Sequence, residues 1–406
     1  MAEPKIKFRQ NDGSNYPEWE TIPMSEIFTE ISEKNHPELP VLSVQQGVGT
    51  ILRDSSDRNI LYDKKNLSGY KAMKKDDFII HLRSFEGGLE CSNYDGISSP
   101  AYRILRPNRI LSGAYRDYFR SDDFINNKLA VSVVGIRDGK NIDMDTFWQI
   151  LITVPCLEEQ QKIADFLGDV DTLIKTSEQE LLKLKELKKG CLQKMFPRGD
   201  ADVPEVRFPG FTGAWERRKL GDVLEDLYNG QTPSRLNANY WNGKINWLSS
   251  GELNRGRVYS SIETITEEGQ KSANLRIIPR GTFVMAITGL EAAGTRGNCA
   301  ILEFDTTVNQ SCMALFPKKD VLTTEYLFQW YQLVGEEYGL RFTQGTKQQS
   351  YNADIVSKLE ICLPRIDEQR KLSDFLEIID NLIALQKREC EKYKELKKGL
   401  LQQMFV

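Results

Sequence analysis

One stretch of the chain decides its fold: PCLEEQQKIADFLGDVDTLIKTSEQELLKLKELKKGCLQKMF, residues 155–196. A second stretch, residues 364–405, reads PRIDEQRKLSDFLEIIDNLIALQKRECEKYKELKKGLLQQMF. The two align without a gap at a constant offset of 209 residues, from Pro155 to Pro364, and roughly half of their positions are identical. A weaker match joins residues 4–28 with residues 204–224, where a Trp-Glu pair recurs. The chain therefore contains one structural unit twice.

Both stretches have the period of a helix. Apolar residues recur in alternating steps of four and three over about 35 residues, which is typical of a narrow seam between paired helices. Polar residues interrupt the series at matching places, Ser177 and Lys188 in one copy and Gln386 and Lys397 in the other, where we expect a non-helical partner to make contact. At about 1.5 Å per residue each helix is roughly 55–60 Å long. The alternative is that each helix packs only on its own domain. The seam expected to pair the helices comprises Ile163, Leu167, Val170, Ile174, Leu181, Leu184, Leu372, Leu376, Ile379, Ile383, Tyr393 and Leu400.

The intervening stretches, residues 28–154 and 220–363, have a different pattern. Short apolar runs, at 78–80, 129–134, 282–287 and 299–302, are separated by Gly, Asn, Asp and Pro. This pattern predicts mixed strands and short helices. The two stretches share little identity beyond the lead-in. We therefore predict an α+β protein with a pseudo-twofold internal duplication. Two mixed α/β domains, 1–154 and 198–363, are separated by two long coiled-coil helices, 155–197 and 364–406, which can bury their seams against each other.

Composition excludes several classes of function. The 406 residues suffice for two to four domains, and the formal net charge of -4 does not indicate a nucleic-acid or membrane partner. Two histidines make a multi-histidine metal site improbable, so we expect no metal. Seven scattered cysteines without a Cys-x-x-Cys pair indicate a reducing compartment. No apolar run approaches the roughly 18 residues of a membrane span. We expect a cytoplasmic protein.

The duplicated boxes carry a resemblance to a known family. The chain resembles the specificity subunit of type I restriction–modification systems in its two proline-led Glu-Gln boxes, 155–167 and 364–376. Each box continues into a helix that ends in Lys-Glu-Leu-Lys-Lys-Gly. The segment Gly-Gln-Thr-Pro-Ser at 230–234, followed by Tyr-Trp at 240–241, is also similar to that family.

The resemblance implies a function. It implies that the two long helices pair antiparallel as a coiled coil. It also implies two target-recognition domains that each read one half of a bipartite, asymmetric double-stranded DNA target. It also implies a scaffold for two copies of an adenine-N6 methyltransferase subunit and for a motor–nuclease restriction subunit. S-adenosylmethionine, ATP and Mg²⁺ would bind only to those partners, and this chain would need no cofactor. Two stiff helices would then act as a ruler between two major-groove segments.

DNA contacts must come from local clusters, because neither domain carries more Lys and Arg than Asp and Glu. In the first domain, arginines interleaved with aromatic residues suit phosphates, guanine edges and sugars. A solvated helix or strand face is the alternative there. In the second domain, glycine-punctuated polar loops suit base edges, although ordinary surface loops have the same composition. The loop 43–47 and the segment 83–85 are weaker candidates. The candidates are Tyr102, Arg103, Arg106, Arg109, Arg116, Arg120, Gln231, Thr232, Ser234, Arg235, Arg296, Thr346, Lys347 and Gln348.

No catalytic motif is present in the sequence. Gly47-Val-Gly49 lacks the third glycine of a nucleotide fingerprint, and neither a Walker A motif nor an Asn/Asp-Pro-Pro-aromatic loop for a flipped adenine occurs. Acidic pairs at 76–77, 122–123 and 267–268 are expected to be solvated turns. We therefore predict a non-catalytic DNA-reading subunit. The alternative is a duplicated coiled-coil adaptor without DNA binding, which salt-dependent affinity would distinguish.

Overall fold

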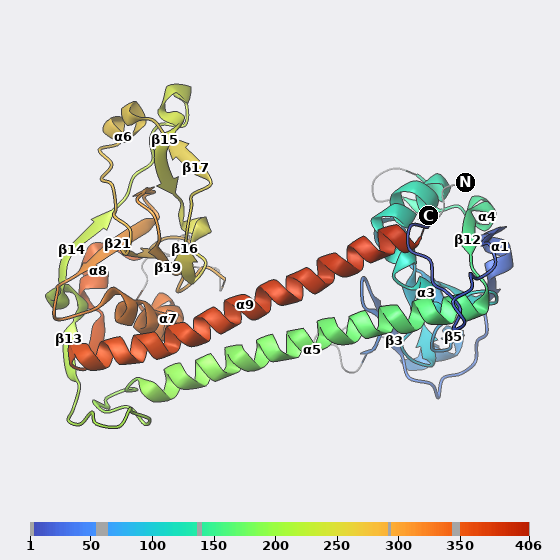
Figure 1. Ribbon diagram of the computed structural model, residues 1–406, viewed down its shortest axis with the longest axis horizontal. Helices are drawn as coiled ribbons and strands as arrows, with labels where there is room; N and C mark the ends of the chain where they lie inside the picture. Colours follow the sequence, from blue (N-terminus) through green and yellow to red (C-terminus); the bar gives the residue numbers. More distant parts are fainter. Residues whose placement is uncertain (1–3, 54–63, 136–139, 291–293, 343–349, 406) are drawn as a thin grey trace. The chain divides into compact units, whose positions relative to one another are not determined.

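The computed structural model describes residues 4–53, 64–135, 140–290, 294–342 and 350–405. The chain divides into two compact units, Met1–Glu178 with Arg388–Val406 (unit 1) and Gln179–Lys387 (unit 2). The division falls inside two 39-residue helices, α5 (Leu157–Met195) and α9 (Ile366–Met404), drawn green and red (Figure 1). Each unit is thus a mixed α/β domain together with parts of both helices. Within the described residues, no helix has the length and apolarity to cross a membrane.

Unit 1 is built on a small antiparallel sheet with strand order β2-β9-β6-β7. Two further antiparallel pairs, β3 with β4 and β5 with β8, lie beside it. Its largest core cluster joins the sheet to Ile163 and Leu167 of α5 and to Met404 and Phe405 at the end of α9. The elements are β1 (Glu20–Pro23), α1 (Met24–Ile27), β2 (Phe28–Ile31), β3 (Leu42–Gln45), β4 (Gly49–Leu52), η2 (Lys64–Gly69), β5 (Lys71–Met73), β6 (Phe78–Ile80), α2 (Ser84–Gly87), β7 (Glu90–Cys91), β8 (Gly96–Ser98), β9 (Arg103–Pro107), α3 (Ser112–Tyr115), η3 (Tyr118–Arg120), η4 (Phe124–Lys128), η5 (Leu129–Ser132), β10 (Val133–Val134), β11 (Asn141–Ile142), α4 (Met144–Gln149) and β12 (Leu151–Val154).

Unit 2 has different sheets, with orders β14-β21-β18-β19-β16 and β17-β15-β20. The three-stranded sheet carries α6 and forms a lobe away from α7 and α9 (Figure 1). Its largest core cluster joins α7 to Leu192 and Met195 of α5 and to Leu372 and Leu376 of α9. The elements are β13 (Glu216–Lys219), η7 (Leu220–Val223), β14 (Leu224–Asn229), η8 (Ala238–Tyr240), β15 (Trp241–Leu248), η9 (Ser250–Glu252), β16 (Gly256–Val258), β17 (Glu263–Ile265), α6 (Glu267–Ser272), β18 (Phe283–Ala286), β19 (Cys299–Leu302), β20 (Thr307–Val308), β21 (Cys312–Pro317), α7 (Thr324–Arg341), α8 (Ala353–Lys358) and β22 (Glu360–Leu363).

The two units share a frame around these unlike sheets. In unit 1 the lead-in strand β1 pairs antiparallel with β12, and in unit 2 the lead-in strand β13 pairs antiparallel with β22. A buried tyrosine fastens each pair to the domain. The Tyr115 hydroxyl donates to the Thr153 carbonyl (2.9 Å), and the Tyr326 hydroxyl donates to the Cys362 carbonyl (2.6 Å). The duplication therefore extends into segments where the sequence shows little identity.

The glutamine of each Glu-Gln box holds the start of a long helix. Gln160 and Gln369 are both fully buried, and each donates to the carbonyl of the proline five residues before it (2.9 and 3.0 Å). Their amide oxygens accept from domain loops, from the Leu111 N–H (2.7 Å) and the Thr323 N–H (3.0 Å). Since a buried backbone group needs a hydrogen-bond partner, one side chain satisfies the helix entry and the loop together.

The seam positions of α5 and α9 all lie buried or half-buried. The helices contact each other antiparallel in both units. In unit 1, Lys397 and Lys394 of α9 pair with Asp171 (2.5 Å) and Glu178 (2.6 Å) of α5. In unit 2, Lys188 of α5 pairs with Asp380 of α9. The expectation that Lys188 receives a non-helical partner was wrong, because its side chain is buried and carries this ion pair.

One predicted strand is mostly a turn. The apolar runs at 78–80, 282–287 and 299–302 contain strands β6, β18 and β19. The run at 129–134 instead begins with the 3₁₀ helix η5, and only Val133 and Val134 pair in a sheet. The Ser132 hydroxyl donates to the Leu129 carbonyl (2.7 Å). This local hydrogen bond stabilises a turn, whereas a strand would need an extended backbone here.

Candidate nucleic-acid interface

The arginines of strand β9 and its following loop point to separate acidic partners. Arg103 and Arg106 lie on opposite faces of the strand, because side chains alternate along it. Arg103 pairs with Glu30 (2.9 Å), and Arg106 makes two bonds to Asp77 (2.9 and 2.8 Å). Asp77 is only 2% exposed, so the prediction of a solvated acidic turn was wrong at this residue.

Arg109 faces a further pair of acids. Its guanidinium contacts Glu20 (2.5 Å) and Glu26 (3.1 Å), both at the surface of unit 1. Tyr102 is half-buried beside the ring of His81, with the ring centroids 6.4 Å apart. The predicted cluster is therefore not one continuous basic face in the described residues.

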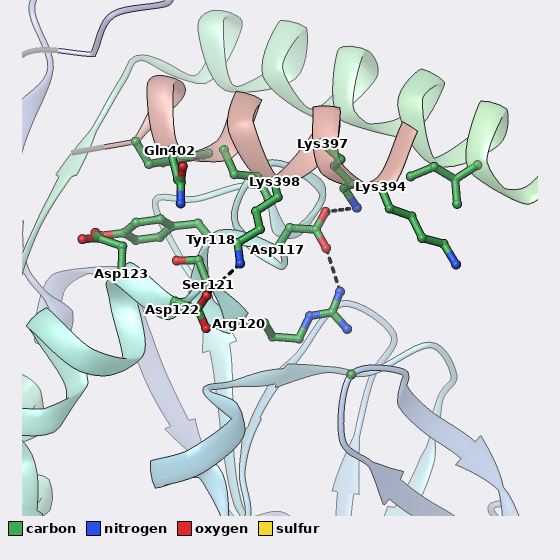
Figure 2. A pocket seen from close by; sticks show the side chains of 14 residues that line it. Asp117, Tyr118, Arg120, Ser121, Asp122, Asp123, Lys394, Lys397, Lys398 and Gln402 are labelled. Atoms are coloured by element: carbon green, nitrogen blue, oxygen red, sulfur yellow. Dashed lines mark hydrogen bonds and ion pairs between the residues drawn. The ribbon is translucent and has the colours of Figure 1, made fainter. Parts of the chain in front are cut away.

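Arg116 and Arg120 approach the long helices. Arg116 Nη2 lies 2.6 Å from Asp171 of α5. Arg120 Nη2 lies 2.7 Å from Asp117, whose other oxygen lies 2.7 Å from Nζ of Lys397 on α9 (Figure 2). These arginines hold the domain against the helices, and their role as DNA contacts stays a prediction.

The aromatic residues between these arginines do not face solvent. Tyr115, Tyr118 and Phe119 are 0%, 3% and 0% exposed, and they pack in the core of unit 1. Tyr118 stacks on Phe405 at the end of α9, with the ring centroids 4.7 Å apart. The prediction that these aromatics pack against sugars or bases was wrong, because their alternation with charge marks the inner face of a domain–helix contact.

Buried charges at the two helix contacts have shifted pKa values. Burial opposes the charge of Asp117, but Lys397 and Arg120 outweigh burial and lower the pKa of its carboxyl below the usual 3.8. Burial lowers the pKa of Lys188 from its usual 10.5, although Asp380 opposes that change. Both helix contacts therefore contain charges that depend on their partners to remain ionised.

A pocket of about 710 Å³ lies in unit 1 beside these ion pairs (Figure 2). Its wall includes Arg120, Gly47 and the exposed Lys398, which pairs with Asp122 (3.1 Å). The described residues contain no group of three or more His, Cys, Asp or Glu side chains that could hold a metal ion. The pocket combines both signs of charge with apolar side chains from α5 and α9.

In unit 2 the loop after β14 brings four predicted residues together. Gln231, Ser234 and Arg235 are exposed, and the Thr232 hydroxyl hydrogen-bonds Gln310. The loop packs on the three-stranded lobe, where the Trp247 indole N–H donates to the Gln231 carbonyl (3.1 Å).

Arg235 is held rigidly within this loop. Its guanidinium carbon lies 3.6 Å from the ring centroid of Trp241 and 5.0 Å from that of Trp247, and Glu263 pairs with it (2.5 Å). The next residue, Leu236, is 98% exposed. A stacked, ion-paired arginine beside exposed amides presents a preorganised polar surface.

The remaining candidates lie elsewhere. Arg296 donates from Nε to the Leu290 carbonyl (2.7 Å) and packs beside Gly339 of α7. Thr346, Lys347 and Gln348 lie outside the described residues. Sequence reasoning missed the acids that pair with the arginines, since most are distant in sequence and follow no local motif.

Comparison with known proteins places these features in a family. The family described as "Type I restriction modification DNA specificity domain" matches residues 105–186 and 213–395. This chain belongs to that family. The match covers parts of both units and most of each long helix.

The relatives of this specificity subunit differ from it at most positions of their sequences. The chain is 23% identical over 316 residues to the "Type I restriction enzyme MjaVIII specificity subunit" of Methanocaldococcus jannaschii, covering 75% of this chain and 72% of that one. It is 26% identical over 200 residues to the "Type I restriction enzyme EcoR124I/EcoR124II specificity subunit" of Escherichia coli, covering 45% and 48%.

Solved structures share the fold of this specificity subunit. A type I restriction–modification S subunit from M. genitalium aligns with a TM-score of 0.57 at 12% identity, covering 100% of this chain and 99% of that one. A chain from a study titled "Structural basis underlying complex assembly and conformational transition of the type I R-M system" aligns with a TM-score of 0.59 at 18% identity, covering 96% and 97%.

Proposed function

We propose that this specificity subunit reads a bipartite, asymmetric DNA target, with one half-site for each unit. The observation that carries the proposal is one frame holding two unlike sheets. The paired lead-in strand, the buried glutamine and the helix contact recur in both units, while the sheets between them differ in strand number and order. A repeated frame would present two readers in equivalent ways, and unlike readers would select unlike sequences.

The long helices would set the spacing between half-sites. Each has 39 residues, or about 58 Å at 1.5 Å per residue. We propose that they form one antiparallel coiled coil between two recognition domains. Such a rod would span one to two turns of DNA, at about 34 Å each. The antiparallel contacts within each unit support this arrangement.

The unit 2 loop at 231–235 offers the better reading surface. Amide and hydroxyl side chains suit base edges in the major groove, and a stacked arginine keeps its donors in a fixed plane. In unit 1 the arginines of β9 and the following loop face separate acids, whereas Arg235, which is also ion-paired, lies beside the exposed Gln231 and Ser234. With a net charge of -4, the isolated chain should bind DNA weakly, and a partner with a basic surface should strengthen binding.

The catalytic work would belong to partner subunits. We propose that the chain scaffolds two copies of an adenine-N6 methyltransferase subunit and a motor–nuclease restriction subunit. S-adenosylmethionine would then bind to the methyltransferase, and ATP and Mg²⁺ to the motor–nuclease. The duplicated frame supports two equivalent docking positions for the methyltransferase.

Methylation mapping tests the proposal. The chain is co-expressed with its methyltransferase partner, and methylated adenines are mapped across the host genome. We expect one motif with two dissimilar halves and a fixed spacer. Gln231→Ala should relax the second half only, whereas Arg280→Ala, which removes an exposed arginine paired with Glu303, should leave both halves unchanged. A complex that assembles but binds DNA without salt dependence and methylates no motif would favour the adaptor alternative.

A further inference from the structure

A chain of polar contacts in unit 1 joins an exposed hairpin tip to the long helices. The tip of the β3–β4 hairpin, residues 45–48, is exposed and carries Gln45 and Gln46. At its centre the Gly47 N–H donates to Glu90 Oε1 (2.6 Å). Gly47 has a positive φ of 78°, which favours glycine at this turn.

Glu90 connects the hairpin tip to Arg120. Its side chain is fully buried on β7, and its second oxygen lies 3.5 Å from Nη1 of Arg120. Burial raises the pKa of the Glu90 carboxyl, while the Gly47 N–H and Arg120 oppose that rise. A buried carboxylate is costly unless it is paired, so its presence behind an exposed turn needs a reason beyond packing.

The contacts continue from Arg120 to both helices. Arg120 reaches Asp117 (2.7 Å), Asp117 reaches Lys397 of α9 (2.7 Å), and Lys397 reaches Asp171 of α5 (2.5 Å). Figure 2 shows Asp117 between Arg120 and Lys397, with α9 passing above them. Every contact in this chain of groups lies within unit 1.

We propose that Glu90 and Arg120 are positioning residues that hold the hairpin tip 45–48 as a DNA-reading element for the first half-site. This inference rests on the proposed function. Glutamine amides can bond two atoms of an adenine edge, but only if their backbone is held in place. A tip that is fixed before DNA binds loses less conformational entropy on binding than a flexible loop.

The packing of Gln46 supports a fixed tip. A Cβ placed at Gly87 of α2 would lie 2.6 Å from Gln46 Nε2 and 2.8 Å from its Cγ, so the glutamine side chain lies close against the Gly87 backbone. The tip is thus held by two contacts, one with Glu90 and one with α2.

The helix contact of unit 2 is built differently. Lys188, the repeat equivalent of Lys397, bonds Gln332 and lies 5.9 Å from the ring centroid of Phe328. Phe328 follows the buried Tyr326 by two residues, as Asp117 follows the buried Tyr115. The carboxylate that connects Arg120 to the helix in unit 1 is thus replaced by an aromatic ring. Perturbing Glu90 or Arg120 should therefore leave the second half-site unaffected.

The test uses the complex of the full chain with its methyltransferase partner. Glu90→Gln keeps the side-chain shape but removes the charge, and Arg120→Met removes the brace while filling similar space. We expect both variants to lower discrimination against single mismatches in the first half-site about tenfold, as Gln45→Ala should. Discrimination in the second half-site should not change, which also shows that the complex is folded and assembled. Arg120→Lys should restore most of the loss, and Arg9→Ala, which removes an exposed arginine of unit 1 that is not among the candidate contacts, should have no effect.

Salt dependence separates a brace from a DNA contact. A residue that only positions the tip leaves the slope of log Kd against log salt unchanged, whereas loss of one phosphate contact reduces that slope by about 1. An unchanged slope with relaxed first-half reading supports the proposal. Unaltered first-half discrimination in Glu90→Gln and Arg120→Met overturns it, and so does a reduced slope in Arg120→Met. If the unmodified complex recognises no bipartite motif, the proposed function itself fails.

Discussion

Removing Asp380 should destabilise unit 2 more than removing both members of its ion pair. The partner, Lys188, is 7% exposed, and without Asp380 its ammonium would keep the neutral Gln332 side chain as a hydrogen-bond acceptor but no carboxylate. Breaking a buried pair costs about 3–5 kcal/mol. Because the Asp380 side chain is 30% exposed, the expected cost of Asp380→Ala is about 2–4 kcal/mol.

The companion variants complete a double-mutant cycle. Lys188→Met leaves a partly solvated carboxylate that still accepts from Gln329 (2.9 Å), so it should cost about 1–2 kcal/mol. The double variant has no unpaired Lys188 ammonium, so it should lower the free energy of unfolding by less than Asp380→Ala alone. The cycle therefore predicts a coupling energy of about 2 kcal/mol.

Urea unfolding followed by tryptophan fluorescence measures these energies. Four of the six tryptophans lie in unit 2, at positions 215, 241, 247 and 330, so the signal reports mainly the unit that holds the pair. Additive single-variant costs, or a cost below about 1 kcal/mol for Asp380→Ala, would refute the reasoning.

The pH dependence gives an independent check. Burial already lowers the pKa of Lys188 below its usual 10.5, and removing Asp380 should lower it further. The folded state then binds fewer protons than the unfolded state, so stability rises with pH between the folded and unfolded pKa values. The penalty of Asp380→Ala should shrink as pH is raised from 7 to 10, and a penalty that grows would contradict a buried, charged Lys188.

Four further perturbations follow from the same geometry. Gln369→Ala removes the hydrogen-bond partner of the Thr323 N–H and of a proline carbonyl, and it should lower the free energy of unfolding in urea by about 2–4 kcal/mol. Tyr326→Phe loses one hydrogen bond and should cost about 1 kcal/mol in the same assay. Because the pKa of Asp117 is lowered, its stabilising effect is present above pH 3.8 and is lost as pH falls through the lowered value; Asp117→Asn should flatten that acid-side loss between pH 5 and pH 2. Deleting one heptad from both helices, between the two ion pairs, removes about 10.5 Å and should shorten the spacer in the methylated motif by about three base pairs.

The long helices could be predicted because their signal is local and occurs twice. The 4-3 alternation is read from neighbouring residues, and its repetition identifies the same seam in both copies. The buried Lys188 belongs to that register even though it interrupts the apolar series. Its partner Asp380 is 192 residues away, and no local rule connects them.

The arginine cluster shows where such reasoning fails. Arg106 pairs with Asp77, 29 residues away in sequence, and Arg116 pairs with Asp171, 55 residues away. These neutralising acids lie outside the short stretch of sequence that looks basic, so the sequence pattern does not reveal them. The prediction that the interleaved aromatic residues contact DNA fails for the same reason. Alternation of charge and ring predicts an amphipathic surface, but it does not say whether DNA or the chain's own helices cover the apolar side.

The positions of the buried charges explain why the duplicated helices pair antiparallel. Each copy carries an aspartate and, 17 residues later, a lysine: Asp171 and Lys188 on α5, Asp380 and Lys397 on α9. In the antiparallel arrangement each aspartate meets the lysine of the other copy. A parallel arrangement in register would set Asp171 against Asp380 at half-buried positions and the buried Lys188 against Lys397, and like charges so placed are unfavourable. Apolar seams of similar sequence would tolerate either direction, so these four residues favour the one that brings the end of each helix to the domain at the start of the other.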